Sequence, residues 1–174
     1  MILVSNKIYL SATAIADADE LVSCLRDKEI SDNALSIPYP YTMQHALSWL
    51  HDNRIFEEEN GFNLYHAIRI ENGALIGIID LDPSYSTDKE QSEFGYWLSK
   101  PYWNKGIMTS VILKFCEIAK QQFKLKTLIA HVFVANQASQ KVLLKAGFMQ
   151  LETIPGKFKK DAKKIDAVKF VKQL

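Results

Sequence analysis

The stretch YWNKGIMTS, residues 102 to 110, decides how this chain of 174 residues is interpreted. It joins a strand-like segment, SEFGYWLS at 92 to 99, to an apolar run in which residues from Ile107 to Ala119 recur on one face of a helix. The first four amide groups of any helix have no partner within it, and Ser, Thr, Asp or Asn usually caps them. Here the helix entry is Asn-Lys-Gly, which leaves two interpretations: a surface cap by Asn104, or a site for an anion.

The anion interpretation rests on two residues of this turn. Gly106 has no side chain, so a large ligand can reach the backbone amides there. Lys105 adds a cation where the helix already carries partial positive charge, and this costs helix stability unless an anion is bound. Because a strand, a glycine-bearing turn and a helix start together form a phosphate-binding arrangement, the pattern favours a phosphate site over a simple cap.

Composition and charge exclude several classes of protein. Hydrophobic residues make up 48% of the chain, as in globular proteins, and the net charge of +1 gives no basic surface for nucleic acid or acidic membranes. The lysine-rich run KFKKDAKK, 157 to 164, is interpreted as a solvated loop. With no apolar run near the roughly 18 residues of a membrane span and no secretory signal, we expect a cytoplasmic protein. Cys24 and Cys116 lack metal-binding spacing, which predicts free thiols and no metal.

Hydrophobic periodicity and turn residues predict the order of strands and helices. Strands are expected at 6–11, 62–70, 74–82, 92–99, 126–136, 148–156 and 165–174. Helices are expected at 16–27, 43–59, 107–123 and 137–146. We therefore predict one domain, residues 1–174, of the mixed α/β (α+β) class. It has a mostly antiparallel sheet of about seven strands and about four helices, with one parallel pair forced by the crossover through 92–134.

Two segments together resemble a known family. FGYWLSKPYWNKGIMTS, 94 to 110, followed by HVFVANQASQKVLLKAGF, 131 to 148, resembles the GNAT acetyltransferase superfamily, most closely its branch that acetylates N-terminal amines of ribosomal proteins. IPYPYT at 37–42 and IDAVKFVKQL at 165–174 resemble the same branch, so the likeness covers nearly the whole chain. It implies a sheet splayed between the fourth and fifth strands. It also implies acetyl-CoA as co-substrate and direct transfer of its acetyl group to a primary amine, with a protein N-terminus favoured.

The resemblance also implies the coenzyme-binding turn. In the family, this turn follows the pattern Q/R-x-x-G-x-G/A, and its backbone amides hold the pyrophosphate of acetyl-CoA. In this sequence the pattern begins at Trp103, has Gly106 as its first glycine, and has Met108 in place of the second small residue. The implied coenzyme residues of the turn are Trp103, Asn104, Lys105, Gly106, Ile107 and Met108. The Met108 side chain either crowds the phosphates or points away into the core.

A second family element, N-x-x-S followed by GF, matches Asn136 and Ser139. The resemblance implies that Asn136 contacts the pantetheine arm, and that Ser139 contacts the sulfur and donates a proton to the leaving thiolate. The residues alone equally allow Asn136 to be no more than a helix cap. Backbone N–H groups near Leu98 and Ser99 are expected to bind pantetheine and polarise the thioester carbonyl.

Glu93 is the candidate general base, acting through a water molecule; a surface glutamate on the strand is an equal alternative. Tyr39, Tyr41 and Trp49 are candidates for the acceptor pocket, with ordinary packing as their alternative. His66 and His131 lie on predicted strands, where a core histidine is favoured over a catalytic one. Cys24 and Cys116 have no evident activating neighbour, so a covalent acetyl-cysteine route is disfavoured.

Three rival functions stay open at this stage. The acceptor is a protein N-terminus or a small amine such as a polyamine or an antibiotic. The same fold would also serve a non-catalytic acyl-CoA sensor, or an interaction protein with no coenzyme site. The expected partners are acetyl-CoA and the amine, without nucleic acid or membrane, and a homodimer is compatible with the sequence.

Overall fold

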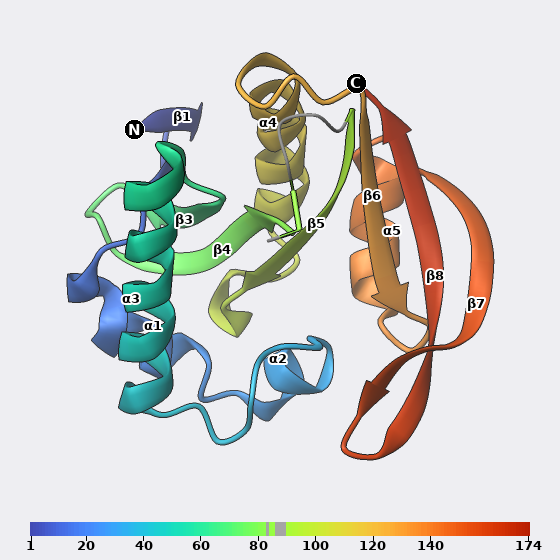
Figure 1. Ribbon diagram of the computed structural model, residues 1–174, viewed down its shortest axis with the longest axis horizontal. Helices are drawn as coiled ribbons and strands as arrows, with labels where there is room; N and C mark the ends of the chain where they lie inside the picture. The colour runs from blue at the N-terminus through green and yellow to red at the C-terminus, as the bar shows by residue number, and fades with distance from the viewer. Residues whose placement is uncertain (83, 86–89) are drawn as a thin grey trace. The chain divides into compact units, whose positions relative to one another are not determined.

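The computed structural model describes residues 1–82, 84–85 and 90–174, which form two compact units. The first unit contains residues 1–80 and 96–107, and the second contains residues 81–95 and 108–174. The chain therefore passes from one unit to the other three times: within each of two strands, and again at the start of a helix. Each unit is described here by itself (Figure 1).

The described residues form eight strands, five α-helices and two short 3-10 helices. The strands are β1 (Ile2–Ser5), β2 (Ile8–Ser11), β3 (Tyr65–Ile70), β4 (Leu75–Leu81), β5 (Gln91–Leu98), β6 (Thr127–Phe133), β7 (Met149–Lys160) and β8 (Lys163–Gln173). The helices are η1 (Ile15–Asp17), α1 (Ala18–Cys24), α2 (Lys28–Asp32), α3 (Met43–Asn60), η2 (Lys100–Tyr102), α4 (Ile107–Gln121) and α5 (Gln137–Lys145). Hydrogen bonding orders the strands β1-β2-β3-β4-β5-β6-β8-β7.

In the first unit, helices α1 and α3 pack against the antiparallel strands β2, β3 and β4. Their contact is a buried apolar cluster contributed by both helices and both inner strands: Ala18, Leu21, Ala46, Leu50, Ala67, Leu75 and Ile78. Helix α3 begins where the sequence predicts, because the Thr42 side chain accepts a hydrogen bond from the amide of His45. Ala46 and Leu50 of this helix are buried.

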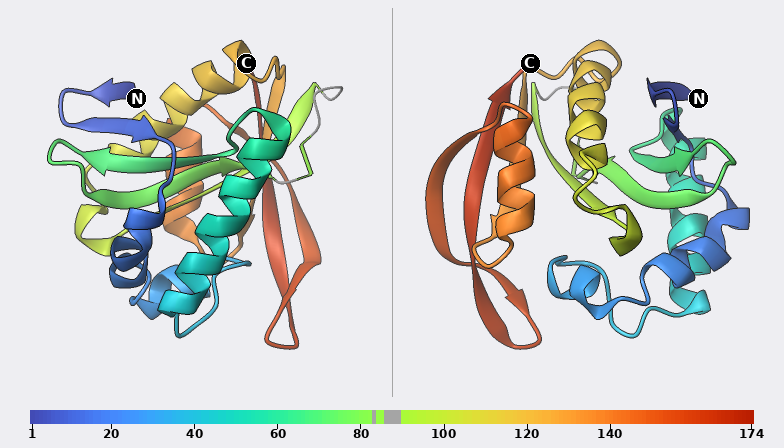
Figure 2. Two further views of the ribbon diagram at one scale, coloured as in Figure 1. Left: turned by 60° about the vertical axis from the view of Figure 1, so that its left-hand side comes forward. Right: turned by 180° about the vertical axis from the view of Figure 1, so that it is seen from behind.

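In the second unit, α4 and α5 lie on one side of β5, β6 and β8, as both ribbon views show (Figures 1 and 2). Phe94 of β5 anchors this layer, with its ring 6.1 Å from that of Phe115 and 5.4 Å from that of Phe148. Phe115 lies on α4 and Phe148 follows α5. One side chain of β5 therefore contacts aromatic rings from the regions of both helices. The alternate residue Glu93 then lies on the other face of the strand.

The predicted parallel pair is confirmed, and its pairing is short. Strand β5 runs parallel to β6 over three residue pairs, from Gln91 opposite Thr127 to Glu93 opposite Ile129. Among the described residues this pairing ends at Glu93, although β5 continues to Leu98 and β6 to Phe133. This early end of the pairing is the splay that the sequence predicts between its fourth and fifth strands, which are β5 and β6 of the structure.

Three predictions about elements need correction. The sheet has eight strands instead of about seven, because Ile2–Ser5 pairs with β2 as an additional edge strand. The helix expected at 16–27 is divided into η1 and α1, and Asp27 caps the separate helix α2. The run 157–164 is the end of the β7–β8 hairpin, with Lys160 opposite Lys163, and not a loop.

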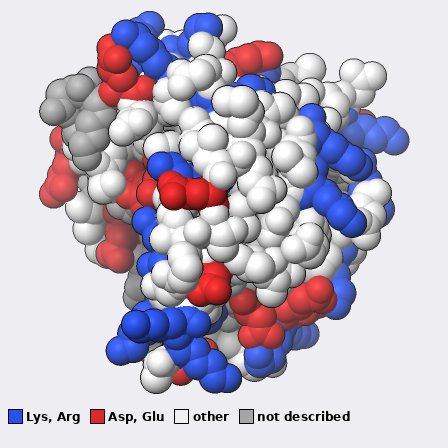
Figure 3. All heavy atoms as spheres, turned by 90° about the vertical axis from the view of Figure 1, so that its right-hand side faces the viewer, with Lys and Arg blue, Asp and Glu red and all other residues white. Residues whose placement is uncertain are grey.

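The lysines of this hairpin end lie on both paired strands, with Lys159 opposite Lys164 and Lys160 opposite Lys163. Asp161 and Ala162 make the turn itself, with φ angles of 48° and 63°. In the space-filling view, Lys and Arg gather at the lower end, the level at which the hairpin ends in Figure 1 (Figure 3).

Among the described residues, no helix is long and apolar enough to cross a membrane.

Candidate active site

The turn at residues 103–106 has the backbone of an anion-binding site. Asn104 and Gly106 both adopt left-handed conformations, with φ of 59° and 75°. A Cβ atom built on Gly106 would meet no other atom within 4 Å, so the space beside this backbone is open. The amides of Ile107 and Met108, the first two residues of α4, donate no hydrogen bond to any other described residue. A helix start of this kind attracts anions, because its amide dipoles point outward.

The two lysines near the turn differ in their availability. Lys100 Nζ lies 2.8 Å from Glu29 Oε2 and 3.3 Å from Asp27 Oδ2, so its charge is already neutralised. Lys105 is exposed, and its Nζ lies 5.5 Å from the centre of the Tyr102 ring. Lys105 is therefore the cation of this turn that remains available to a phosphate.

The structure answers the question raised by Met108. Its side chain is buried with Val111 and Ile112 on the apolar face of α4 in the second unit. Of the two expected orientations, it adopts the one that points into the core. The bulk of Met108 is therefore held in the core of the second unit.

Hydrogen bonds fix the end of β5 that precedes the turn. The Trp103 indole Nε1 donates to the Leu98 carbonyl oxygen at 2.6 Å, so Trp103 acts within the protein as a clamp on Leu98. The Ser99 amide donates to the Ile76 carbonyl at 2.7 Å. The expectation that the Ser99 amide polarises a thioester therefore needs correction, because that donor is already used.

Gly77 of β4, a residue that the sequence analysis did not single out, allows β5 to approach closely. A Cβ atom at Gly77 would lie 2.4 Å from the Trp97 carbonyl oxygen and 3.1 Å from the Leu98 Cα atom. The first distance is far shorter than an ordinary contact and the second is tight, and both involve backbone atoms that cannot rotate away. The position of Leu98 therefore depends on the absence of a side chain at residue 77.

Asn136 and Ser139 meet at the start of α5 in the second unit. The Asn136 Oδ1 atom accepts a hydrogen bond of 3.0 Å from the Ser139 amide, so Asn136 is the helix cap. Both side chains are partly exposed. The cap uses only the oxygen of the Asn136 amide group, which leaves its Nδ2 donors to serve another function. The two interpretations of Asn136, helix cap and coenzyme contact, are therefore compatible.

Glu93 has a partner in His131, for which the sequence favoured a core histidine over a catalytic one. Glu93 Oε2 lies 2.9 Å from His131 Nδ1 of the neighbouring strand β6. The His131 side chain is 6% exposed and that of Glu93 is 43% exposed. Glu93 is thus neither an isolated surface glutamate nor a buried one. Its carboxylate is partly exposed to solvent, while one of its oxygens, Oε2, contacts a buried imidazole.

All three acceptor candidates belong to the first unit, but only two of them pack against the same apolar cluster. Tyr41 and Trp49 pack against the α1–α3 cluster, as do Tyr65 and Trp97, which the sequence analysis missed. Trp49 and Tyr65 contact edge to face, with ring centres 5.2 Å apart. Burial raises the pKa of Tyr41, so its phenol stays neutral. Tyr39 is 53% exposed and is not part of this aromatic group.

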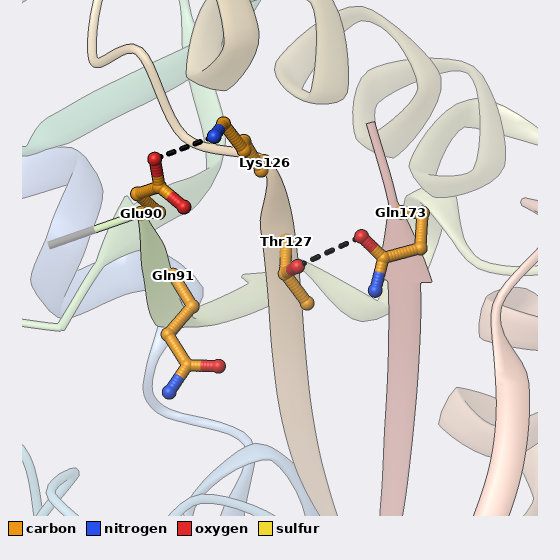
Figure 4. A pocket seen from close by; sticks show the side chains of 5 residues that line it. All are labelled: Glu90, Gln91, Lys126, Thr127 and Gln173. Carbon is orange, nitrogen blue, oxygen red and sulfur yellow. Dashed lines mark hydrogen bonds and ion pairs between the residues drawn. The ribbon is translucent and has the colours of Figure 1, made fainter.

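Two other features carry no chemistry of this kind. A hollow of about 540 Å³ lies where β5 and β6 begin, and none of the predicted site residues lines it. Its walls are Glu90, Gln91, Lys126, Thr127 and Gln173, two pairs of which bond to each other (Figure 4). Burial raises the pKa of both free thiols, Cys24 and Cys116, which disfavours a covalent route through either.

Comparison with known proteins identifies the family. Residues 7–149 match the family model described as acetyltransferase (GNAT) domain, so the chain belongs to the GNAT acetyltransferases. The protein YoaA of Bacillus subtilis, named an uncharacterized N-acetyltransferase, is 25% identical over 154 residues, which are 86% of this chain and 83% of that protein. YdaF of the same organism, a putative ribosomal N-acetyltransferase, is 29% identical over 79 residues, 45% of this chain and 43% of that protein.

Solved structures of low sequence identity share the fold. RimL, a ribosomal L7/L12 alpha-N-protein acetyltransferase in complex with coenzyme A, has a TM-score of 0.88 at 15% identity and covers 99% of this chain and 97% of its own. The microcin C7 self immunity acetyltransferase MccE, in complex with acetyl-CoA and AMP, has a TM-score of 0.84 at 19% identity, with 98% and 94% covered. The predicted family is thus confirmed, and its structural neighbours include the branch that the sequence resembles.

Proposed function

We propose that this GNAT acetyltransferase moves an acetyl group from acetyl-CoA to the amine of a protein N-terminus, within a single catalytic domain in the cytoplasm. The observation that supports it most directly is the turn with left-handed Asn104 and Gly106 at the start of α4 in a chain of this family. The names of YdaF and RimL support a ribosomal protein as the acceptor. The amides from residues 104 to 108 would hold the pyrophosphate, and Asn136 the pantetheine arm.

The proposed reaction is a direct transfer in a complex of enzyme, acetyl-CoA and amine. Glu93, through a water molecule, removes one proton from the acceptor ammonium. The neutral amine then forms a bond to the acetyl carbon, and the bond from that carbon to sulfur breaks. Ser139 donates a proton to the departing thiolate and regains one from the amine nitrogen, which loses its second proton as it becomes the amide. An α-amine has a pKa near 8 and is roughly one-tenth neutral at pH 7, so it demands less of a base than a lysine amine does.

A small amine is the second candidate acceptor. It is favoured by the aromatic group of Tyr41, Trp49 and Tyr65, which offers flat apolar surfaces, and by the structural likeness to MccE. An assay of thiol release separates these acceptors. The panel contains peptides with free N-termini, peptides whose N-terminus is acetylated so that only a lysine amine is free, and small amines. Tight acetyl-CoA binding without turnover on any of them would indicate the acyl-CoA sensor instead. The absence of a thermal shift with acetyl-CoA would indicate the interaction protein.

The turn itself is tested by Gly106→Asp. This change sets a carboxylate beside the proposed pyrophosphate, so we expect acetyl-CoA to bind at least tenfold more weakly by isothermal titration calorimetry. Gly61→Asp is the matched control, because Gly61 also has a φ near 75° with open space around it, but it ends α3. The control should bind acetyl-CoA as the wild type does. Equal affinities for the two variants would falsify the coenzyme assignment.

A further inference from the structure

The pair of Glu93 and His131 results from the register of two parallel strands. Glu93 stands opposite Ile129, and His131 follows Ile129 by two residues, so its side chain projects from the same face of the sheet. A diagonal pair of this kind lies within reach of long side chains. The result is the 2.9 Å contact between Glu93 Oε2 and His131 Nδ1, made from strands 38 residues apart in the sequence.

Residues of three other strands lie against His131 or face it, and its side chain is 6% exposed. The Phe158 ring of β7 meets it edge to face, with the ring centres 6.2 Å apart and the planes at 86°. Phe158 also packs on Phe133, two residues along β6. The charged groups that face the imidazole from neighbouring strands are Glu93 of β5 and Lys169 of β8, which stands opposite His131 in the ladder.

These contacts give the two members of the pair different freedom. A buried polar group requires a hydrogen-bonding partner, and Nδ1 of the buried imidazole has Glu93 as its partner. The glutamate side chain has three rotatable bonds, and its exposed carboxylate would otherwise adopt many positions. A hydrogen bond from an imidazole ring that is fixed by packing restricts the carboxylate to one position. The second carboxylate oxygen, Oε1, is then left to face the solvent.

We propose that His131 is a positioning residue for Glu93. It donates its Nδ1 hydrogen to Oε2 and so holds Oε1 where it accepts the proton of the acceptor amine. This role rests on the proposed function, since Glu93 is the base of that reaction. The proton leaves the ammonium, passes through the intervening water and is taken up by Oε1, and the resulting carboxyl keeps its hydrogen bond to His131. His131 touches neither acetyl-CoA nor the amine.

Two amide substitutions at residue 131 test this role. In His131→Asn the amide nitrogen lies near the place of Nδ1, and in His131→Gln it lies near the place of Nε2. We expect the Asn variant to keep kcat within about threefold of the wild type, and the Gln variant to lose about tenfold. KM for acetyl-CoA should not change in either. Equal kcat values for the two variants would overturn the proposal, because a merely structural role does not depend on where the donor lies.

A double-mutant cycle locates the effect at Glu93. In Glu93→Gln the base is absent, so adding His131→Gln should cause no further loss of kcat. Independent losses that multiply would overturn the proposal. Phe158→Leu is the control for packing; since it loosens the ring contact with His131 but removes no donor, it should lower kcat less than His131→Gln does.

Long-range hydrogen–nitrogen NMR spectra of the free protein provide a measurement that needs no turnover. At pH 8 we expect the His131 hydrogen on Nδ1, and a hydrogen on Nε2 alone would overturn the proposed donor.

The acceptor panel is run first on the wild type. If the wild type acetylates no amine, the proposed function fails; if it does and the residue-131 variants behave otherwise than expected, only the role of His131 fails.

Discussion

Two ionisable pairs, one in each unit, show how the same chemistry serves different ends. In the first unit, Arg69 Nη2 lies 2.8 Å from Asp17 Oδ2, with side chains 12% and 6% exposed. Arg69 also donates to Ser11 Oγ and to the Gly73 carbonyl, and Asp17 accepts from the Ala14 amide. In the second unit, Glu93 and His131 make a contact of similar length, but Glu93 is 43% exposed.

The difference lies in what each carboxylate can still do. The Asp17 carboxylate is enclosed and bonded on several sides, so its contribution is to stability. The Glu93 carboxylate has one oxygen bound and the other open, so it can react. Breaking the first pair should therefore change stability and leave the rate per folded molecule intact, whereas breaking the second should do the reverse.

The largest effect is expected from Arg69→Met. This change leaves the buried Asp17 charge without its partner, which typically costs about 3–5 kcal/mol. Urea unfolding followed by circular dichroism measures it. The control Arg54→Gln removes an exposed pair with Glu58 on α3 and should leave the unfolding midpoint unchanged. If both variants unfold at the same urea concentration, the enclosed network does not have the structural role described above.

A smaller effect, on rate alone, is expected from Glu93→Gln. Loss of a general base typically lowers kcat by about 10²-fold. The loss should be largest near neutral pH and should ease as pH rises, because an acceptor amine with a pKa near 8 then becomes neutral without a base. The pH–rate profile and the urea midpoint are measured together. A profile of unaltered shape would dismiss Glu93 as the base.

The smallest effect concerns His66 of β3, a buried imidazole that belongs to neither pair. Burial lowers its pKa below the ordinary value of about 6.5, so the unfolded chain binds this proton more readily than the folded protein does. The contribution of His66 to stability is therefore complete above pH 6.5 and is lost as pH falls below it. The loss is limited to about 1.4 kcal/mol for each unit by which the pKa is lowered.

Unfolding free energies at pH 7.5 and pH 5 measure this effect in the wild type and in His66→Leu. The variant should lose less stability between the two values than the wild type, because all other titrating groups are shared. A wild type and a variant with the same dependence on pH would contradict the prediction.

Much of the fold followed from local patterns. Thr42 before an apolar helix, and the helical spacing from Ile107 to Ala119, each predict an element from neighbouring residues alone, and both are confirmed. The crossover rule then predicted the parallel pair. The run at 157–164 was misjudged because its polar lysines hide the alternation of Phe158 and Ile165, which lie opposite each other across the hairpin.

The site was harder to predict because it depends on register. No local pattern shows that Glu93 stands opposite Ile129, and a shift of one residue would turn His131 to the other face. The useful signal was nonetheless in the sequence: two titratable residues on strands predicted to be parallel neighbours. The close approach at Gly77 gave no such signal, because it involves only backbone atoms of Trp97 and Leu98.

Gly77 also has a consequence for how this chain can vary. It bears no charge and no reactive atom, so a search for functional groups passes over it. A Cβ atom there would nevertheless overlap the carbonyl of Trp97 at 2.4 Å, whichever of the other nineteen residues supplied it. In a library of random variants selected for activity, we expect position 77 to tolerate fewer replacements than Asp80, the partly exposed residue of the same strand. Mutational tolerance, more than chemistry, would reveal its importance.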